Sequence, residues 1–168
     1  MQSTDYVLPP RIPRFLAALA SQFIRSPRAC AGRLAFALRL DAYNGRTRIV
    51  GLLYFLEALY LRDQWRRRGV RHVHVHFAQT GASVAMIACH ASELSYSFTI
   101  HESETLEDPA RYGLRQKVGC AAAIVCISEL ARRAVASLLP LGQQDKVHVV
   151  RCGLELDRYL STKAASTP

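Results

Sequence analysis

The chain has 168 residues, half of them hydrophobic, and a formal net charge of +9. This length and composition suffice to bury a core, which excludes an intrinsically disordered chain and a short disulfide-dependent scaffold. The positive charge suits polyanions in general, namely nucleic acid, anionic lipid headgroups or phosphorylated small molecules. Arginines that merely solvate helix faces would explain the same excess.

Cysteine usage and the lack of targeting patterns predict a reducing compartment. The cysteines are odd in number and scattered in spacing, and no C-x-x-C pair occurs, which is typical of small buried side chains. They are Cys30, Cys89, Cys120, Cys126 and Cys152. We find no signal peptide, and no apolar stretch reaches the about 20 residues of a transmembrane helix. We therefore expect a cytoplasmic protein.

The first 70 residues predict helices and no strand. After an irregular lead-in at 1–13, helices are expected at 14–24, 26–40 and 49–68, with a turn at 41–45. Ser26 before Pro27 suits a helix start, and Gly69 after three arginines suits a helix end.

After Gly69 the pattern changes to strands that alternate with helices. Strands are expected at 72–77, 95–100, 122–127 and 146–151, helices at 81–91, 109–120 and 128–139, and an acidic loop at 101–108. The strand at 122–127 is continuously apolar, which indicates burial on both faces. The alternation predicts an α/β fold: a Rossmann-like parallel sheet with helices on both faces.

In such a sheet, ligands bind beyond the carboxyl ends of the strands. His76 and residues 101–104 lie at two such ends. His101 is suited to move a proton near neutral pH, and Glu104 would lie on the same side if the loop turns helical. A solvated acidic loop is the alternative.

Two further patterns allow a ligand. Residues 128–129 open a helix, and the free N–H groups at a helix start suit a phosphate. However, Ser128 also suits the cap position of a helix, which requires no ligand. The histidines at 72, 74 and 76 share a strand face, as metal ligands do, and with His101 and Glu104 they would make a metal-dependent hydrolase. However, His72 would lie about 13 Å from His76, so we expect no metal site.

Four segments in order resemble the retaining glycosyltransferases of family 4, most closely the exopolysaccharide or colanic-acid type. The segments are HVHVHFA (72–78), SFTIH (97–101), IVCISE (124–129) and VHVVRCGLELDRY (147–159). These enzymes have the GT-B architecture, in which two Rossmann-like domains face each other across a cleft. The resemblance implies an N-terminal, acceptor-side domain and a function in polysaccharide biosynthesis.

The resemblance also implies roles for individual residues. It implies catalytic positioning for His101 and Glu104, acceptor binding for His76, and a hinge at Cys152, Gly153 and Glu155. Gly81, Ser128 and Glu129, which follow strand ends, are expected to join His76 in acceptor binding. Cys152 stands where relatives have Asn, Glu155 where they have Asp, and Glu104 where they often have Asp. These departures affect the fine geometry of the site rather than the fold.

We expect three parts: a helical lead-in at 1–48, the Rossmann-like acceptor-side domain at 49–159, and a disordered tail or linker at 160–168. An opening strand with its glycine-containing loop and the nucleotide-sugar domain of the family have no counterpart, so the chain is expected to be a fragment. No activity is assigned to the fragment; the complete enzyme would be a retaining hexosyltransferase.

The implied substrates are a nucleotide-sugar donor and a glycan or lipid-linked acceptor, with no cofactor or metal and no nucleic acid. Peripheral contact with anionic membrane at its inner face would use the basic surface. Two other functions stay open, a non-catalytic basic module that binds anionic membrane or a partner domain, and the metal-dependent hydrolase.

Overall fold

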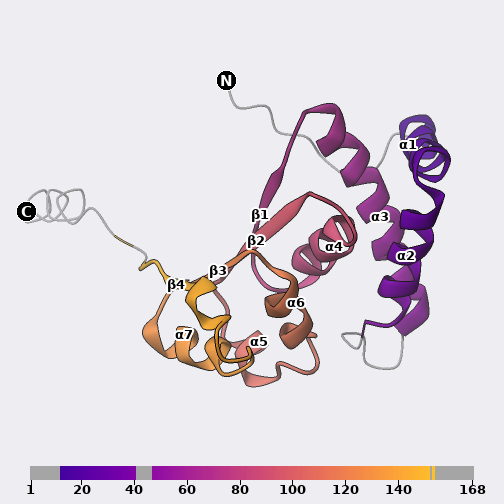
Figure 1. Ribbon diagram of the computed structural model, residues 1–168. Coiled ribbons are helices and arrows are strands. Elements are labelled where there is room, and N and C mark those ends of the chain that lie inside the picture. The colour runs from indigo at the N-terminus through magenta and orange to yellow at the C-terminus, as the bar shows by residue number, and fades with distance from the viewer. Residues whose placement is uncertain (1–11, 41–46, 152, 154–168) are drawn as a thin grey trace, which may run out of the picture.

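The computed structural model describes residues 12–40, 47–151 and 153. In chain order (Figure 1) the elements are α1 (Ile12–Arg25), α2 (Pro27–Leu38), α3 (Thr47–Arg67), β1 (His72–His76), α4 (Thr80–Cys89), β2 (Ser95–Ile100), α5 (Glu104–Glu107), α6 (Leu114–Cys120), β3 (Ala123–Cys126), α7 (Glu129–Ala136), η1 (Gln144–Lys146) and β4 (Val147–Val149). The turn predicted at 41–45 and the tail at 160–168 lie outside the described residues.

The four strands form a parallel sheet in the order β1-β2-β3-β4. The predicted α/β fold with a parallel sheet flanked by helices is therefore confirmed. Each strand is followed in the chain by its neighbour on the same side in the sheet. When all such connections are right-handed, their helices lie on one face of the sheet. In Figure 1 the described helices lie on that single side of the sheet. A helical layer on the other face is not among the described residues.

The two faces of the sheet differ in chemistry because strand residues alternate between them. One face is apolar and buried, with Tyr96, Phe98 and Ile100 of β2 at its centre. The other carries hydroxyl and imidazole side chains from β1 and β2. In β3, Ile124 and Cys126 are buried whereas Ala123 and Val125 are half-buried, so the burial predicted for both faces is complete on one face only.

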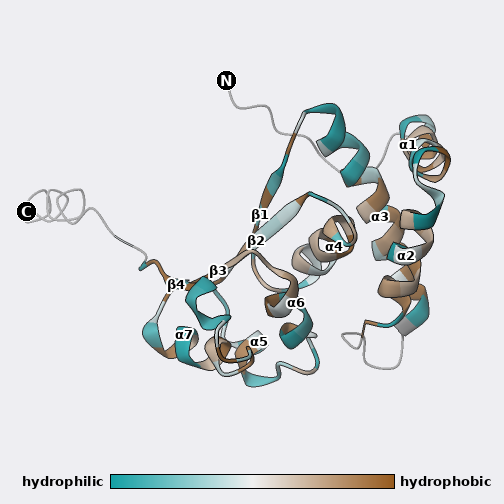
Figure 2. Cartoon of the chain, viewed as in Figure 1, coloured by the Kyte–Doolittle hydropathy of each residue, from teal (hydrophilic) through white to brown (hydrophobic). Residues whose placement is uncertain are grey.

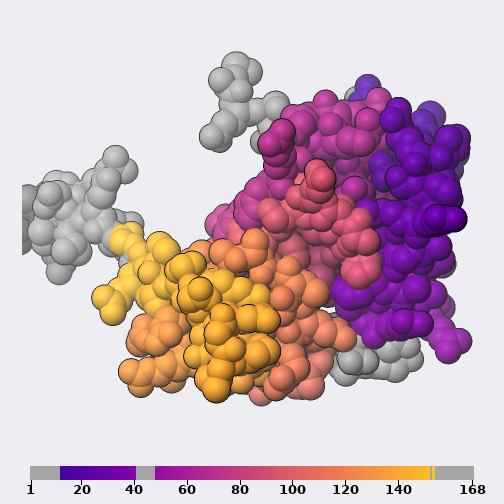
Figure 3. Space-filling model, viewed as in Figure 1, coloured from indigo at the N-terminus to yellow at the C-terminus, as the bar shows by residue number. Residues whose placement is uncertain are grey.

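The core lies between the sheet and the N-terminal helices, with α4 in the middle. Residues 82–88 of α4 are all buried, because α4 contacts β1 and β2 on one side and α2 and α3 on the other. Its small side chains permit this double packing: a Cβ atom added at Gly81 would lie 3.1 Å from Val75 Cγ1. Figure 2 shows the apolar colours of α4 between the sheet and α3, and Figure 3 shows α1–α3 forming one side of the surface.

Most predicted helix ends are found where the sequence places them. Ser128 Oγ accepts a hydrogen bond from Ala131 N (3.1 Å), as a cap does, and Gly69 adopts φ 66°. Ser26 occupies the cap position of α2 but makes no capping hydrogen bond with its side chain. None of the described helices is long and apolar enough to cross a bilayer.

Residues 101–120 differ from the prediction. The helix expected from residue 109 begins only at Leu114, because Gly113 adopts a left-handed conformation (φ 58°) directly before it. The loop expected at 101–108 contains one helical turn, α5. The chain therefore turns more often after β2 than the periodicity indicates.

Candidate functional site

The carboxyl ends of the strands bring two predicted site residues together. His76 ends β1, and His101 follows β2 directly. Their Nδ1 and Nε2 atoms are 3.3 Å apart, and the rings stack with centroids 5.6 Å apart. One imidazole therefore donates to the other, and the histidines form a pair rather than two separate groups. We call His76, Phe77 and His101 the histidine edge.

The other two histidines of β1 are held by hydroxyl groups of β2. His72 Nδ1 and Nε2 lie 2.8 and 2.7 Å from the hydroxyl oxygens of Ser95 and Ser97. His74 lies 2.8 Å from Ser97 Oγ and 2.9 Å from Thr99 Oγ1. Burial, assisted by the positive charge of the neighbouring histidines, lowers the pKa of His74. These rings form a hydrogen-bonded ladder that leads along the sheet to the histidine edge.

Phe77 gives the histidine edge an unusual backbone. It adopts φ 72°, a conformation that is costly for a bulky side chain, while its N–H continues the ladder by donating to Thr99 O (2.9 Å). Its ring, about half exposed, lies 5.3 Å from the ring of His101. The chain thus turns sharply after His76 and places an aromatic surface against His101.

Glu102 connects the loops that follow β1 and β2. Its Oε1 atom accepts a hydrogen bond from Ala78 N (2.8 Å), and its Oε2 atom accepts one from His101 N (3.0 Å). A single carboxylate thereby fixes the backbone on both sides of the histidine pair. Hydrogen bonds to a charged acceptor are the stronger kind, so this bridge supports the strained turn at Phe77.

Lys117 of α6 completes this support from inside the protein. The side chain is almost fully buried, and its Nζ atom donates to Ala78 O (2.7 Å) and Gln79 O (2.9 Å). Burial lowers the pKa of Lys117 to about 8, and the negative charge of Glu102 opposes that shift. The loop after β1 is therefore held by a cation through its carbonyls and by an anion through an amide.

A cavity of about 360 Å³ opens beside this network, between the loop after β2 and the start of α7. His101, Glu102 and Ser103 line one side, and Ser128 lies at the other. The remaining lining consists of Glu107 and six apolar residues, Ile100, Leu106, Ile127, Leu130, Ala131 and Ala134. Its size falls within the range of small-molecule sites, about 300–1,000 Å³.

The other predicted site residues have separate surroundings. Glu104 begins α5, is exposed and accepts a hydrogen bond from Tyr112 (3.4 Å). Gly81 packs α4 closely against β1. Glu129 forms an ion pair with Arg132, which lowers the pKa of its carboxyl group by hydrogen bonding. None of these three lines the cavity beside His101.

The described part of the chain contains only some of the residues considered for the hinge or for a metal site. Gly153 is described and exposed, whereas Cys152 and Glu155 lie outside the described residues. Among the residues that the structure describes, no group of three or more His, Cys, Asp or Glu side chains is arranged to hold a metal ion. His72 and His74 are engaged with hydroxyl groups instead.

Sequence reasoning missed the parts played by Glu102, Lys117 and Phe77. Glu102 lies between His101 and Glu104, the two residues that the strand-end pattern favours, but nothing in the sequence shows that it bonds to Ala78. Lys117 carried a usable signal: it occupies a buried position of α6 with Leu114 and Val118, where a charge needs a partner. Its partners are 38 and 39 residues away, too far for a local pattern.

The comparison with protein families connects this geometry to a known class. The model of Glycosyltransferase Family 4 matches residues 8–158, almost the whole chain. The chain belongs to this glycosyltransferase family. It is similar to the N-terminal domain of such enzymes, in agreement with the parallel α/β sheet. No curated protein sequence matches the chain.

Proposed function

We propose that this family 4 domain holds the acceptor in a retaining GT-B glycosyltransferase of the exopolysaccharide or colanic-acid type. The reaction would move a sugar from a nucleotide-sugar donor to a glycan or a lipid-linked acceptor in polysaccharide biosynthesis. The observation that carries the proposal is the histidine pair, which stands at the carboxyl edge of the sheet beside a cavity of small-molecule size.

The proposed chemistry follows from the hydrogen bonds that the pair already makes. The facing nitrogens of His76 and His101 bond to each other, and within the described part of the chain their other nitrogens make no hydrogen bond. Of the two histidines, His101 lines the cavity, and its remaining nitrogen is suited to orient a sugar hydroxyl that enters there. Retention without a protein nucleophile requires the departing phosphate oxygens to assist that hydroxyl, so His101 would tune geometry and charge rather than attack.

The remaining predicted roles belong to the same proposal. Glu104 would act near the donor sugar, and Gly81, Ser128 and Glu129 would contribute to the acceptor side. Cys152, Gly153 and Glu155 would form the hinge. Ser128 supports its role best, because it lines the cavity with His101 while capping α7. No metal or cofactor is part of this proposal.

Transfer activity tests the proposal directly. The chain, supplied with the donor-binding domain of a family 4 enzyme, is assayed with nucleotide sugars and a lipid-linked acceptor. His101→Ala should lower turnover more than about tenfold, because positioning contributes heavily to such reactions. His148→Ala, at an exposed position of β4, is the matched control. Full activity of His101→Ala, or inversion at the anomeric carbon, would contradict the proposal.

The proposal places the domain in the cytoplasm, in peripheral contact with anionic membrane. The exposed apolar side chains of α1 support this placement; they are Ile12, Leu16, Phe23 and Ile24, in a chain of net charge +9. Binding to vesicles of phosphatidylglycerol in phosphatidylcholine should be weak and should decrease between low and high salt. Binding that ignores salt would contradict the electrostatic part of this placement.

A further inference from the structure

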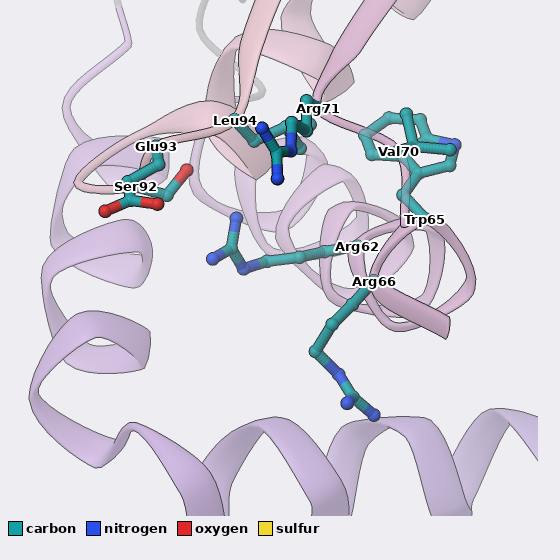
Figure 4. Close-up of a pocket in the computed structure, with 8 residues that line it drawn as sticks. All are labelled: Arg62, Trp65, Arg66, Val70, Arg71, Ser92, Glu93 and Leu94. Carbon is teal, nitrogen blue, oxygen red and sulfur yellow. The ribbon is translucent and has the colours of Figure 1, made fainter. Parts of the chain in front are cut away.

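A second cavity, of about 610 Å³, lies at the amino edge of the same sheet, where α3 ends and β1 and β2 begin. It is lined by Arg62, Trp65, Arg66, Val70, Arg71, Ser92, Glu93 and Leu94, and we call it the arginine cavity (Figure 4). The predicted site residues lie at the other ends of the strands. The arginine cavity is thus separate from the proposed acceptor site.

Two of its arginines lack an acidic partner. Arg62 Nη1 donates to Ala88 O (3.0 Å), and no ion pair joins Arg62 or Arg71 to a carboxylate in the part of the chain that the structure describes. In Figure 4 their guanidinium groups approach the same space, whereas Arg66 points away from it. Arg66 instead bonds to Asp63 (3.2 Å). The cavity therefore presents two guanidinium groups that form no ion pair with a described carboxylate.

The surroundings add positive charge to this space. Unpaired carbonyls at the C-terminal end of α4 would repel an anion. Two of them are paired, because Ala88 O accepts a hydrogen bond from Arg62 and Cys89 O accepts one from Ser92 Oγ (2.9 Å). Arg33 lies within reach of the charge of Arg62 and is about 1% exposed; it donates to Ala91 O, and its Nε and Nη1 atoms have no hydrogen-bond partner among the described residues. Glu93 is the single carboxylate among the eight lining residues.

We propose that the arginine cavity binds the phosphate group of a small organic phosphate. Guanidinium groups match phosphate oxygens in charge and in planar two-point geometry. The volume exceeds the need of a bare phosphate, and Trp65, Val70 and Leu94 offer an apolar wall for the organic part. This inference does not depend on the proposed transferase activity.

Trp65 provides the measurement, because it is the single tryptophan of the chain. Phenyl phosphate and inorganic phosphate are titrated into the full chain at constant ionic strength, and the tryptophan fluorescence is followed. Vesicles of phosphatidic acid in phosphatidylcholine form a second arm. A response to the soluble ester identifies a free phosphate as the ligand source, and a response to vesicles alone identifies a lipid headgroup. Phenyl phosphate should bind more tightly than inorganic phosphate.

Variants of single charges decide the proposal. Arg71→Gln removes an exposed side chain that makes no hydrogen bond with the described residues, and it should weaken binding at least about threefold. Arg62→Gln should weaken it about tenfold, and Glu93→Gln should strengthen it. Arg115→Gln, an equal charge change on α6 outside the cavity, is the control. A response that is absent in both arms, or that Arg71→Gln and Arg115→Gln leave equally intact, would overturn the proposal.

Discussion

The two edges of the sheet hold their ionisable groups in opposite ways. At the carboxyl edge, Glu102 and Lys117 use their charges on backbone groups, so that the histidine pair stands on a fixed support. At the amino edge, Arg62 and Arg71 line the cavity and form no ion pair with a described carboxylate, although Arg62 also donates to Ala88 O. In the functions that we propose, the first edge would position a neutral hydroxyl and the second would attract an anion. Substitutions of these charged groups should therefore affect stability at the carboxyl edge and binding at the amino edge.

Lys117→Met should cause the largest loss of stability. The substitution keeps the side-chain volume but leaves Ala78 O and Gln79 O without their donor inside the protein. Relief from burying an ammonium group offsets part of this loss. We expect the free energy of unfolding to fall by about 2 kcal/mol, measured by urea denaturation.

Lys146→Met is the matched control for that experiment. Lys146 also donates to two carbonyls, Gly119 O (3.0 Å) and Ala121 O (3.1 Å), but nearer the surface, where water replaces the lost bonds. We expect a loss of about 1 kcal/mol or less. Equal losses in the two variants would show that the buried lysine gives the carboxyl edge no special support.

Glu102→Gln should have the next largest effect. Glu102 accepts from two N–H groups, and an amide has only one oxygen, so its NH₂ group would face either Ala78 N or His101 N as a second donor. We expect a loss of about 1 to 2 kcal/mol in unfolding free energy. Glu104→Gln, whose partner is Tyr112 at 3.4 Å, should change stability by less than about 0.5 kcal/mol. The reverse order would mean that Glu104 is the supporting acid.

Acid should weaken the fold through the histidine ladder. The pKa of His74 is lowered in the folded protein, so the unfolded chain binds the proton more readily. Stability is complete above the unfolded value of about 6.5 and decreases as the pH falls through it. His90, whose pKa is lowered by burial and by Arg33, acts in the same direction.

His74→Gln tests the contribution of the ladder to that pH dependence. Urea midpoints measured between pH 7.5 and 5.5 should show a smaller decrease in the variant than in the natural chain. His148→Gln, which removes one exposed imidazole, is the control. An unchanged slope in His74→Gln would mean that the ladder does not resist protonation.

The fold could be predicted from the sequence because its signals are local. Alternating apolar residues mark β1, Gly69 marks a helix end, and Ser128 marks a helix start. The start of α6 was predicted wrongly for a local reason too. The helical periodicity runs on from residue 109, but Gly113 interrupts the helix, which begins only after it. The lack of described helices on one sheet face follows from the strand order, which no single segment encodes.

The candidate site could be predicted only as far as the strand ends. That rule brought His76 and His101 to one edge, but it could not place Glu104, whose side chain bonds to Tyr112. The bridge from Glu102 to Ala78 spans 24 residues, and the contact from Lys117 spans 39. Such contacts arise from the packing of α6 and the loops. The sequence therefore shows that Glu102 and Lys117 are present, but not which distant backbone groups they bond to.

Imidazole NMR can show whether the histidine edge binds the acceptor. The chain has six histidines, and the probe is a short-chain lipid diphosphate that carries one hexose. If the acceptor binds there, His76 and His101 should shift together with one dissociation constant, His148 should not shift, and His101→Ala should abolish the shift of His76. Shifts confined to His90, which lies within reach of the charge of Arg33, or no shift at His76 and His101, would contradict acceptor binding at the histidine edge.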